Sequence, residues 1–168
     1  NSQNSGTLGR LILGLLINTP YPIKLIGDRS LSKRDFKRIS DPLSRFGASF
    51  NLKKNKFLPL IISGSKKLKS INYFEKKGSA QCKSSVIFAA MRAQGETIIK
   101  AKKSRNHTEL LFKYLKLPIK VKLKKNYDLI KINNVKKIKT LNYKIPSDIS
   151  SSAFFIVLTT LTKNSTLR

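Results

Sequence analysis

Apolar runs separated by short polar clusters predict helices and strands that alternate along the chain. Helices are predicted over residues 7–17, 34–46, 79–93, 108–117 and 151–161, with the first, third and last of them buried. Strands are predicted over residues 23–26, 57–62, 69–73 and 96–101, with further strands between 119 and 143. Helices and strands mixed in this way would pack as helices on sheets, so we expect an α/β (α+β) fold.

Residues that start or stop helices refine these boundaries. Gly47 follows the second helix at a C-cap position, and Pro42 inside that helix must be tolerated or must kink it. Asn106 and Glu109 have the spacing of a capping box at the start of the fourth helix.

The order helix, strand, polar loop, helix, strands occurs twice. Ser5 and Ser79 occupy equivalent places 74 residues apart, and Arg34 and Arg105 are 71 apart. Two units of about 70 residues indicate an internal repeat, each unit being βαβαββ-like. The first unit lacks its opening strand and the chain begins at Asn1, so we expect a piece of a longer protein.

The charge is strongly positive. Among 168 residues there are 35 Lys and Arg against 8 Asp and Glu, a formal net charge of +27. A polyanion partner such as RNA or DNA is one interpretation. However, 27 of the cations are Lys and only 8 are Arg, the residue that nucleic-acid readers favour, and the Lys residues are scattered in pairs. The excess of Lys can also come from an AT-rich genome, with the Lys side chains on solvated faces, or it can serve to bind small anionic substrates. A basic nucleic-acid-binding protein is the alternative function.

The composition also limits the chemistry. Cys82 is the only cysteine and His107 the only histidine, so neither an internal disulfide nor a metal cluster is expected. The longest apolar run, 11–17, is far shorter than the roughly 20 residues that span a bilayer. With 40% hydrophobic residues the chain can fill a core, which argues against intrinsic disorder.

Four polar clusters lie at the ends of predicted elements: 4–7, 27–34, 79–81 and 104–107. Taken singly, each has an ordinary explanation as a helix N-cap, a capping loop or a solvated surface loop. Helix starts also attract anions through unpaired N–H groups.

Taken together and in order, the clusters and their flanks resemble the EPSP synthase family. The stretches that carry the resemblance are NSGTLGRLILGLL, GDRSLSKRDFKRISDPLSRFGA, LPLIISG, SINY, GSAQCKS, SRNHTELL and IPSDISSSAFF, which together span nearly the whole chain. The resemblance is to the bacterial forms with SAQ-x-K-S and S-R-x-H-T-E motifs.

The resemblance implies a fold and an activity. The family has two lobes, each of three βαβαββ units; residues 1–145 would be two units of the N-terminal lobe, and 146–168 the hinge and first helix of the C-terminal lobe. The family transfers the enolpyruvyl group of phosphoenolpyruvate to the 5-hydroxyl of shikimate 3-phosphate and releases phosphate, a step of aromatic amino acid biosynthesis that glyphosate inhibits. The resemblance implies that the protein needs no cofactor and has no nucleic-acid or membrane partner. It also implies a cytoplasmic location and, at full length, a monomer. A piece of this extent would be inactive alone.

The resemblance also assigns roles on the shikimate 3-phosphate side. Ser79 and Ser104 match two serines that hold the phosphate, and Ala80 stands where some members have a further Ser. His107 lies where other members have a Tyr. Gln81 lies between the two substrates and, with Arg34, is assigned to catalysis.

On the phosphoenolpyruvate side, Gly6 matches a glycine whose backbone approaches that substrate, and Arg34 matches the arginine that grips it. Asn4 and Thr7 are expected to support the Gly6 turn, Arg10 to be structural, and Asp148 to be a hinge residue.

The sequence departs from the family pattern at four places: Gln3, Asp35, Lys76 and Ala80. Asp35 replaces the Pro that usually follows the matching Arg, and we expect its carboxylate to compete for the guanidinium of Arg34.

Overall fold

Residues 72–132 form a complete βαβαββ unit in the computed structural model, which describes residues 1–145 and 148–167. Its elements are β4 (Asn72–Glu75), α3 (Ala80–Ala90), β5 (Thr97–Lys102), α4 (His107–Tyr114), β6 (Ile119–Leu123) and β7 (Tyr127–Ile132). The sheet order is β4-β5-β7-β6, with β4 and β5 parallel and the other pairs antiparallel. Alternate residues of β7 are buried, as expected for a strand with one face on a core.

The preceding segment repeats this topology. It contains α1 (Gly6–Leu15), β1 (Ile23–Leu25), α2 (Lys37–Ser44), β2 (Ser49–Lys53) and β3 (Phe57–Ser63), with short 3₁₀ turns η1 (Leu16–Asn18) and η2 (Leu31–Lys33). Its sheet order, β1-β3-β2, matches β5-β7-β6. The repeat predicted from the sequence is therefore confirmed, and in the described residues no strand precedes α1.

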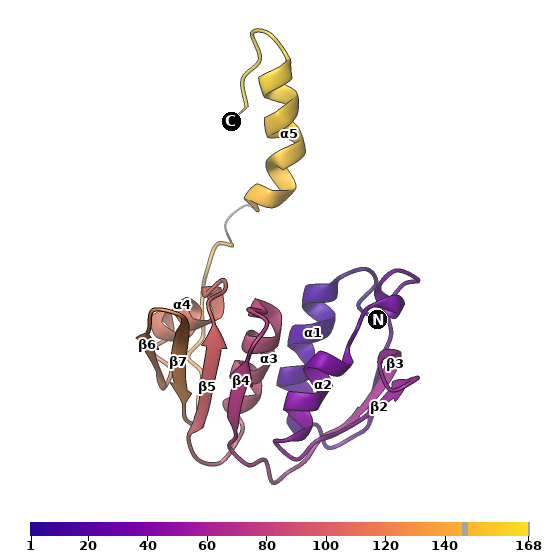
Figure 1. The fold of residues 1–168 in the computed structure, drawn as a ribbon, viewed down its shortest axis with the longest axis vertical. Helices are drawn as coiled ribbons and strands as arrows, with labels where there is room; N and C mark the ends of the chain where they lie inside the picture. The colour runs from indigo at the N-terminus through magenta and orange to yellow at the C-terminus, as the bar shows by residue number, and fades with distance from the viewer. Residues whose placement is uncertain (146–147, 168) are drawn as a thin grey trace.

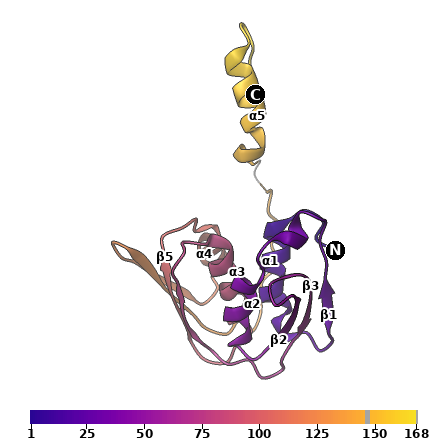
Figure 2. The same cartoon turned by 45° about the vertical axis from the view of Figure 1, so that its right-hand side comes forward.

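Helices α1, α2 and α3 lie between the two sheets (Figures 1 and 2). Ser5 and Ser79 cap α1 and α3 in the same way: each side chain accepts from a backbone N–H three residues on, at 3.1 and 3.3 Å. The two helices touch backbone to backbone, since a Cβ added to Gly14 would lie 2.1 Å from the carbonyl oxygen of Ser85. This close approach requires glycine at position 14 and buries α3 almost completely.

Two predicted boundaries were wrong, and one strand was not predicted. The second helix begins at Lys37 rather than Arg34, because Arg34 is extended (φ −82°, ψ 149°) at the end of η2. The strand expected over 69–73 begins at Asn72. Strand β2 was missed altogether, since it is only five residues long and has two apolar residues, Phe50 and Leu52, between exposed polar ones.

Two cap predictions also need correction. Asn106 makes no capping hydrogen bond from its side chain. Gly47 has the expected left-handed conformation (φ +115°), but it lies two residues beyond the C-cap, Arg45. Pro42 is tolerated within α2.

Helix α5 (Ile149–Leu161) differs most from expectation. It was predicted to be buried, but none of its residues is buried, and it stands apart from the two units (Figure 1). Further strands were predicted between residues 119 and 143, but the last strand among the described residues, β7, ends at Ile132. The predicted hinge begins at residues 146–147, which lie outside the described residues.

Candidate active site

The starts of α3 and α4 meet at one edge of the second sheet. Strands β4 and β5 are parallel, so the loops that follow them leave from the same edge. Gly78 (φ +68°) lies against the second loop, because a Cβ there would be 3.2 Å from the carbonyl oxygen of Lys103. The turn that carries Ser79 therefore passes beside the loop that carries Ser104.

The buried carboxylate of Glu75 holds this turn. It accepts from the backbone N–H groups of Lys77 at 3.2 Å and Ser79 at 2.8 Å. The Oγ of Ser104 has no hydrogen-bond partner in the part of the chain that the structure describes. That hydroxyl is buried, and neither Ser104 nor Ser79 lines the cavity between α1, α3 and α4 described below.

Gln81 joins the start of α3 to α1. Its Oε1 accepts from Arg10 Nη1 at 2.6 Å, and its Nε2 donates to Thr7 Oγ1 at 2.9 Å. The structure thus brings three predicted site residues together. Thr7 supports Gln81 by this bond.

Gly6 and Arg34 lie next to each other at the start of α1, and Arg10 lies beside both Gly6 and Gln81. A Cβ added to Gly6 would lie 3.0 Å from Arg34 Nη1 and 3.6 Å from Arg10 Nη1. Burial, and then the charge of Arg38, lower the pKa of Arg10, and Arg34 adds to this effect. Asp35 opposes part of this effect, but neither Arg10 nor Arg34 forms an ion pair with a carboxylate among the described residues, so their positive charge can attract an anionic ligand.

The loop before Arg34 is held by Asp28. Its Oδ1 accepts from the N–H of Leu31 at 2.7 Å, and its Oδ2 accepts from Asn4 Nδ2 at 2.5 Å. These bonds, the Leu31 one first, lower the pKa of Asp28. Asn4 therefore ties the start of α1 to the arginine loop.

A cavity of about 190 Å³ lies where α1, α3 and α4 meet. Its lining residues are Thr7, Leu11, Ala80, Gln81, Ser84, Arg105, His107 and Thr108. Ala80, Gln81 and His107 were predicted site residues. Arg105 was not, although its place in the second repeat matches that of Arg34, which was the available signal.

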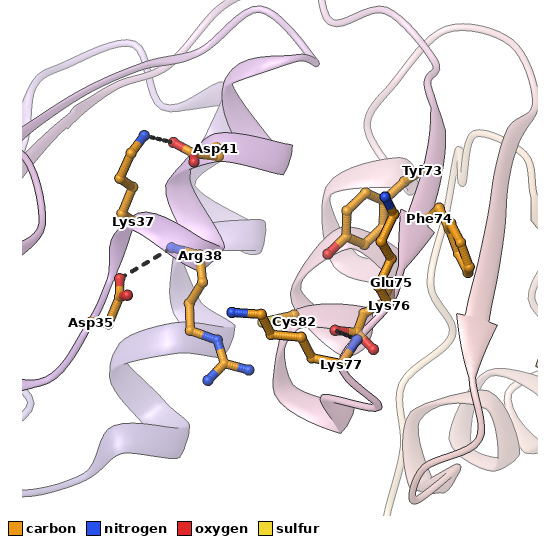
Figure 3. A pocket seen from close by; sticks show the side chains of 10 residues that line it. All are labelled: Asp35, Lys37, Arg38, Asp41, Tyr73, Phe74, Glu75, Lys76, Lys77 and Cys82. Carbon is orange, nitrogen blue, oxygen red and sulfur yellow. Dashed lines mark hydrogen bonds and ion pairs between the residues drawn. The ribbon is translucent and has the colours of Figure 1, made fainter.

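A second cavity, of about 340 Å³, lies between α2 and β4 (Figure 3). It contains Arg38 and the thiol of Cys82 but none of the predicted site residues. Asp35 lines it, and its carboxylate lies 3.7 Å from Lys56 and accepts from the N–H of Arg38 at 3.4 Å. The structure thus shows no ion pair between Asp35 and Arg34, contrary to the competition expected from the sequence.

Asp148 lies away from these groups, at the start of α5 (Figure 1). It caps that helix by accepting from the N–H of Ser150 at 3.0 Å and from Ser151 Oγ at 2.8 Å. Hydrogen bonds from the Ser150 and Ser151 hydroxyls, followed by the bond from the N–H of Ser150, lower the pKa of Asp148.

Among the described residues, no group of three or more His, Cys, Asp or Glu side chains is placed to hold a metal ion. None of the helices described is long and apolar enough to cross a membrane.

The sequence profile of one family matches the whole chain. That family is EPSP synthase (3-phosphoshikimate 1-carboxyvinyltransferase), and the match covers residues 1–168. The chain belongs to the EPSP synthase family. The expected resemblance is confirmed, and so is the fold class.

Individual members of the EPSP synthase family give the extent of the similarity. A 3-phosphoshikimate 1-carboxyvinyltransferase of Caldicellulosiruptor bescii is 47% identical over 167 residues, which are 98% of this chain and 38% of that protein. One of Leuconostoc mesenteroides is 40% identical over 163 residues, 96% of this chain and 37% of the relative. The chain therefore spans about 38% of the length of these relatives.

Solved structures agree. The EPSP synthase of Acinetobacter baumannii superimposes with a TM-score of 0.79 at 36% identity, covering 95% of this chain and 36% of that one. The enolpyruvyl transferase NikO of Streptomyces tendae has a TM-score of 0.50 at 11% identity over 74% of this chain, which indicates shared fold alone.

Proposed function

We propose that the chain provides one side of the active site of a 3-phosphoshikimate 1-carboxyvinyltransferase. In this reaction the 5-hydroxyl oxygen of shikimate 3-phosphate adds to C2 of phosphoenolpyruvate while C3 takes up a proton. The resulting tetrahedral intermediate loses phosphate from C2 and a proton from C3. Residues 1–145 are assigned to two units of the N-terminal lobe, and 146–168 to the hinge and first helix of the C-terminal lobe.

The position of Gln81 is the observation that carries the proposal. Its amide is fixed by Arg10 and Thr7, between the Gly6–Arg34 pair and the cavity under α4. Two anionic substrates that must react with each other need adjacent sites with a polar group between them. The Gly6–Arg34 pair and the cavity between α1, α3 and α4 provide two such sites, and the amide of Gln81 is the polar group between them.

The cavity side suits shikimate 3-phosphate. Ser104 has a hydroxyl without a partner in the described structure, and Ser79 uses its oxygen as an acceptor in the helix cap but keeps a proton to donate. The start of α3 adds N–H groups, and Arg105 adds a cation. Ala80 and His107 line the space for the ring.

The α1 side suits phosphoenolpyruvate. Gly6 allows a ligand to approach the backbone, and the guanidinium of Arg34 beside it can bind a carboxylate or phosphate through two N–H groups. The remaining acid, base and cationic groups are assigned to the rest of the protein. We assign no cofactor, nucleic-acid or membrane partner, and expect the full-length protein to be a cytoplasmic monomer.

The test is a chimera in which residues 1–168 replace the matching segment of the Caldicellulosiruptor bescii relative. We expect it to release phosphate from phosphoenolpyruvate only when shikimate 3-phosphate is present. Arg34→Ala in this chimera should raise the KM for phosphoenolpyruvate and lower kcat/KM about 100-fold, because loss of a charge-assisted contact to the bound substrate costs roughly 2–5 kcal/mol. Arg29→Ala, in the same loop, is the control. A folded chimera without turnover, or an Arg34 variant with unchanged kinetics, would contradict the proposal.

The phosphate assignment has its own test. Calorimetry on the chimera with Ser79→Ala and Ser104→Ala together should show a much larger loss of affinity for shikimate 3-phosphate than for shikimate. Equal losses for the two ligands would favour a purely capping role for these serines.

A further inference from the structure

A buried ion pair joins α3 to α4 directly behind the proposed shikimate 3-phosphate cavity. Lys83 Nζ lies 2.6 Å from Glu109 Oε1, and the two side chains are 0% and 4% exposed. Lys83 belongs to the SAQ-x-K-S motif and Glu109 to the S-R-x-H-T-E motif, and the substrate roles above use neither residue.

The neighbouring residues form a second link. Ser84 Oγ and Thr108 Oγ1 are 2.7 Å apart in a buried hydrogen bond, and both residues line the cavity. The ion pair is therefore one residue away from the cavity wall on each helix. It fixes the separation of the two helices whose first turns carry Ala80, Gln81 and His107.

A buried ion pair is a poor device for stability alone. Removing two charges from water costs several kcal/mol per ion, and apolar residues of similar volume often give equal or greater stability. The contact also lacks hydrogen-bond geometry at Nζ, and Oε2 of Glu109 has no hydrogen-bond partner in the described part of the chain. A role in holding the two helix starts at a fixed separation explains its presence better than stabilisation does.

We propose that Lys83 and Glu109 are positioning residues that set the width of the shikimate 3-phosphate cavity by locking the start of α4 against α3. Helix α4 contributes to this cavity but not to the Gly6–Arg34 side. Loss of the lock therefore affects shikimate 3-phosphate selectively. This inference rests on the proposed function for the identity of the ligand.

The kinetic test uses the chimera with Lys83→Met and Glu109→Leu together, which removes both charges at similar volume. We expect a melting temperature equal to or above that of the parent, a KM for shikimate 3-phosphate raised about tenfold, and a kcat and a phosphoenolpyruvate KM within about threefold. The control is Lys131→Met with Glu96→Leu, which removes a half-exposed pair at 2.8 Å outside the proposed site and should change none of these values. A stable double variant with an unchanged shikimate 3-phosphate KM would overturn the proposal.

Two further measurements keep the inference testable if the double variant does not fold or the chimera does not turn over. Glu109→Asp keeps the charge but shortens the side chain by one methylene, and should raise the same KM by a smaller factor. In the 168-residue chain itself, both the Lys83→Met, Glu109→Leu double variant and Glu109→Asp should speed hydrogen exchange at amides 110–114 of α4. Exchange rates in α1 and α2 should not change. Unchanged exchange in α4 overturns the lock, whereas an inactive chimera with faster α4 exchange overturns only the proposed function.

Discussion

At the scale of single residues, the site depends on donors that the protein itself leaves partly unused. Arg10 Nη1 donates to Gln81 Oε1, which holds these two side chains together before any ligand arrives, while Arg10 Nε has no partner in the described structure. Arg34 and the hydroxyl of Ser104, in contrast, have no acidic or polar partner in the described structure. Fixed supports beside free donors are what an anion-binding site requires.

Gly6→Ala tests the phosphoenolpyruvate side. The added methyl would lie 3.0 Å from Arg34 Nη1, so the guanidinium, at the end of a flexible side chain, must move by a few tenths of an ångström and the space beside it becomes smaller. In the chimera we expect a modest rise in the phosphoenolpyruvate KM and about tenfold or more weaker inhibition by glyphosate, which is the longer molecule. Gly9→Ala, whose methyl would face Phe36 and Ser2 instead, should leave both values unchanged. Equal weakening of both ligands would mean that Gly6 only shapes the turn.

Acid should release the loop that carries Arg34. Bonds from Leu31 and Asn4 lower the pKa of Asp28 below its ordinary value of 3.8. The carboxylate therefore stabilises the fold above about pH 3.8, and this contribution disappears as the pH falls through the lowered pKa. NMR titration of the Asp28 carboxyl should give a midpoint below 3.8, and Asn4→Ala should move it upward. A midpoint at or above 3.8 would argue against these bonds in solution.

At the scale of elements, the contact between α1 and α3 holds the two halves of the site together. The helices meet at Gly14 and Ser85, and Ser85 Oγ donates to the carbonyl of Arg10 at 3.0 Å. One helix carries Gly6, Thr7 and Arg10, and the other carries Gln81. The distance between the substrate sides thus depends on how closely two backbones approach.

Gly14→Ala tests this contact. Alanine favours a helix by about 1 kcal/mol, but its Cβ would be 2.1 Å from a backbone oxygen that cannot rotate away. We expect a net loss of roughly 1–3 kcal/mol in the free energy of unfolding by urea. Gly9→Ala in the same helix meets its neighbours at 3.3 Å or more and should cost less. Equal stability of the two variants would show that the helices can move apart freely.

At the scale of the whole molecule, α5 is the exception to an otherwise well-packed chain. Its apolar side chains face outward, and Phe154 is 81% exposed. Exposed apolar surface of this kind promotes association.

Sedimentation of the 168-residue chain should therefore show association that grows with concentration. A chain of residues 1–145 should sediment as a monomer and unfold at nearly the same temperature, because no residue of α5 is buried. The full chain with Phe154→Ser and Phe155→Ser is the matched control and should associate less. Equal monomeric behaviour of the long and short chains would show that α5 is covered in solution.

The sequence by itself determined the repeat, the fold class and the family. Helix caps, apolar periodicity and ordered motifs are local signals, and serines 74 residues apart cap equivalent helices in the structure. The short strand β2 and the extended residue Arg34 escaped prediction, because pairing with β3 decides the conformation of the first and a 3₁₀ turn that of the second.

Only the tertiary structure decided which polar residues meet. The bonds of Gln81 to Arg10 and Thr7 span 71 and 74 positions, and the Lys83–Glu109 pair spans two helices. Asp35 is next to Arg34 in sequence, yet its carboxylate is directed to Lys56 and the Arg38 backbone. Such partners follow from the crossing of α1 with α3 and from parallel strands that end at one edge, which are properties of packing that no local pattern records.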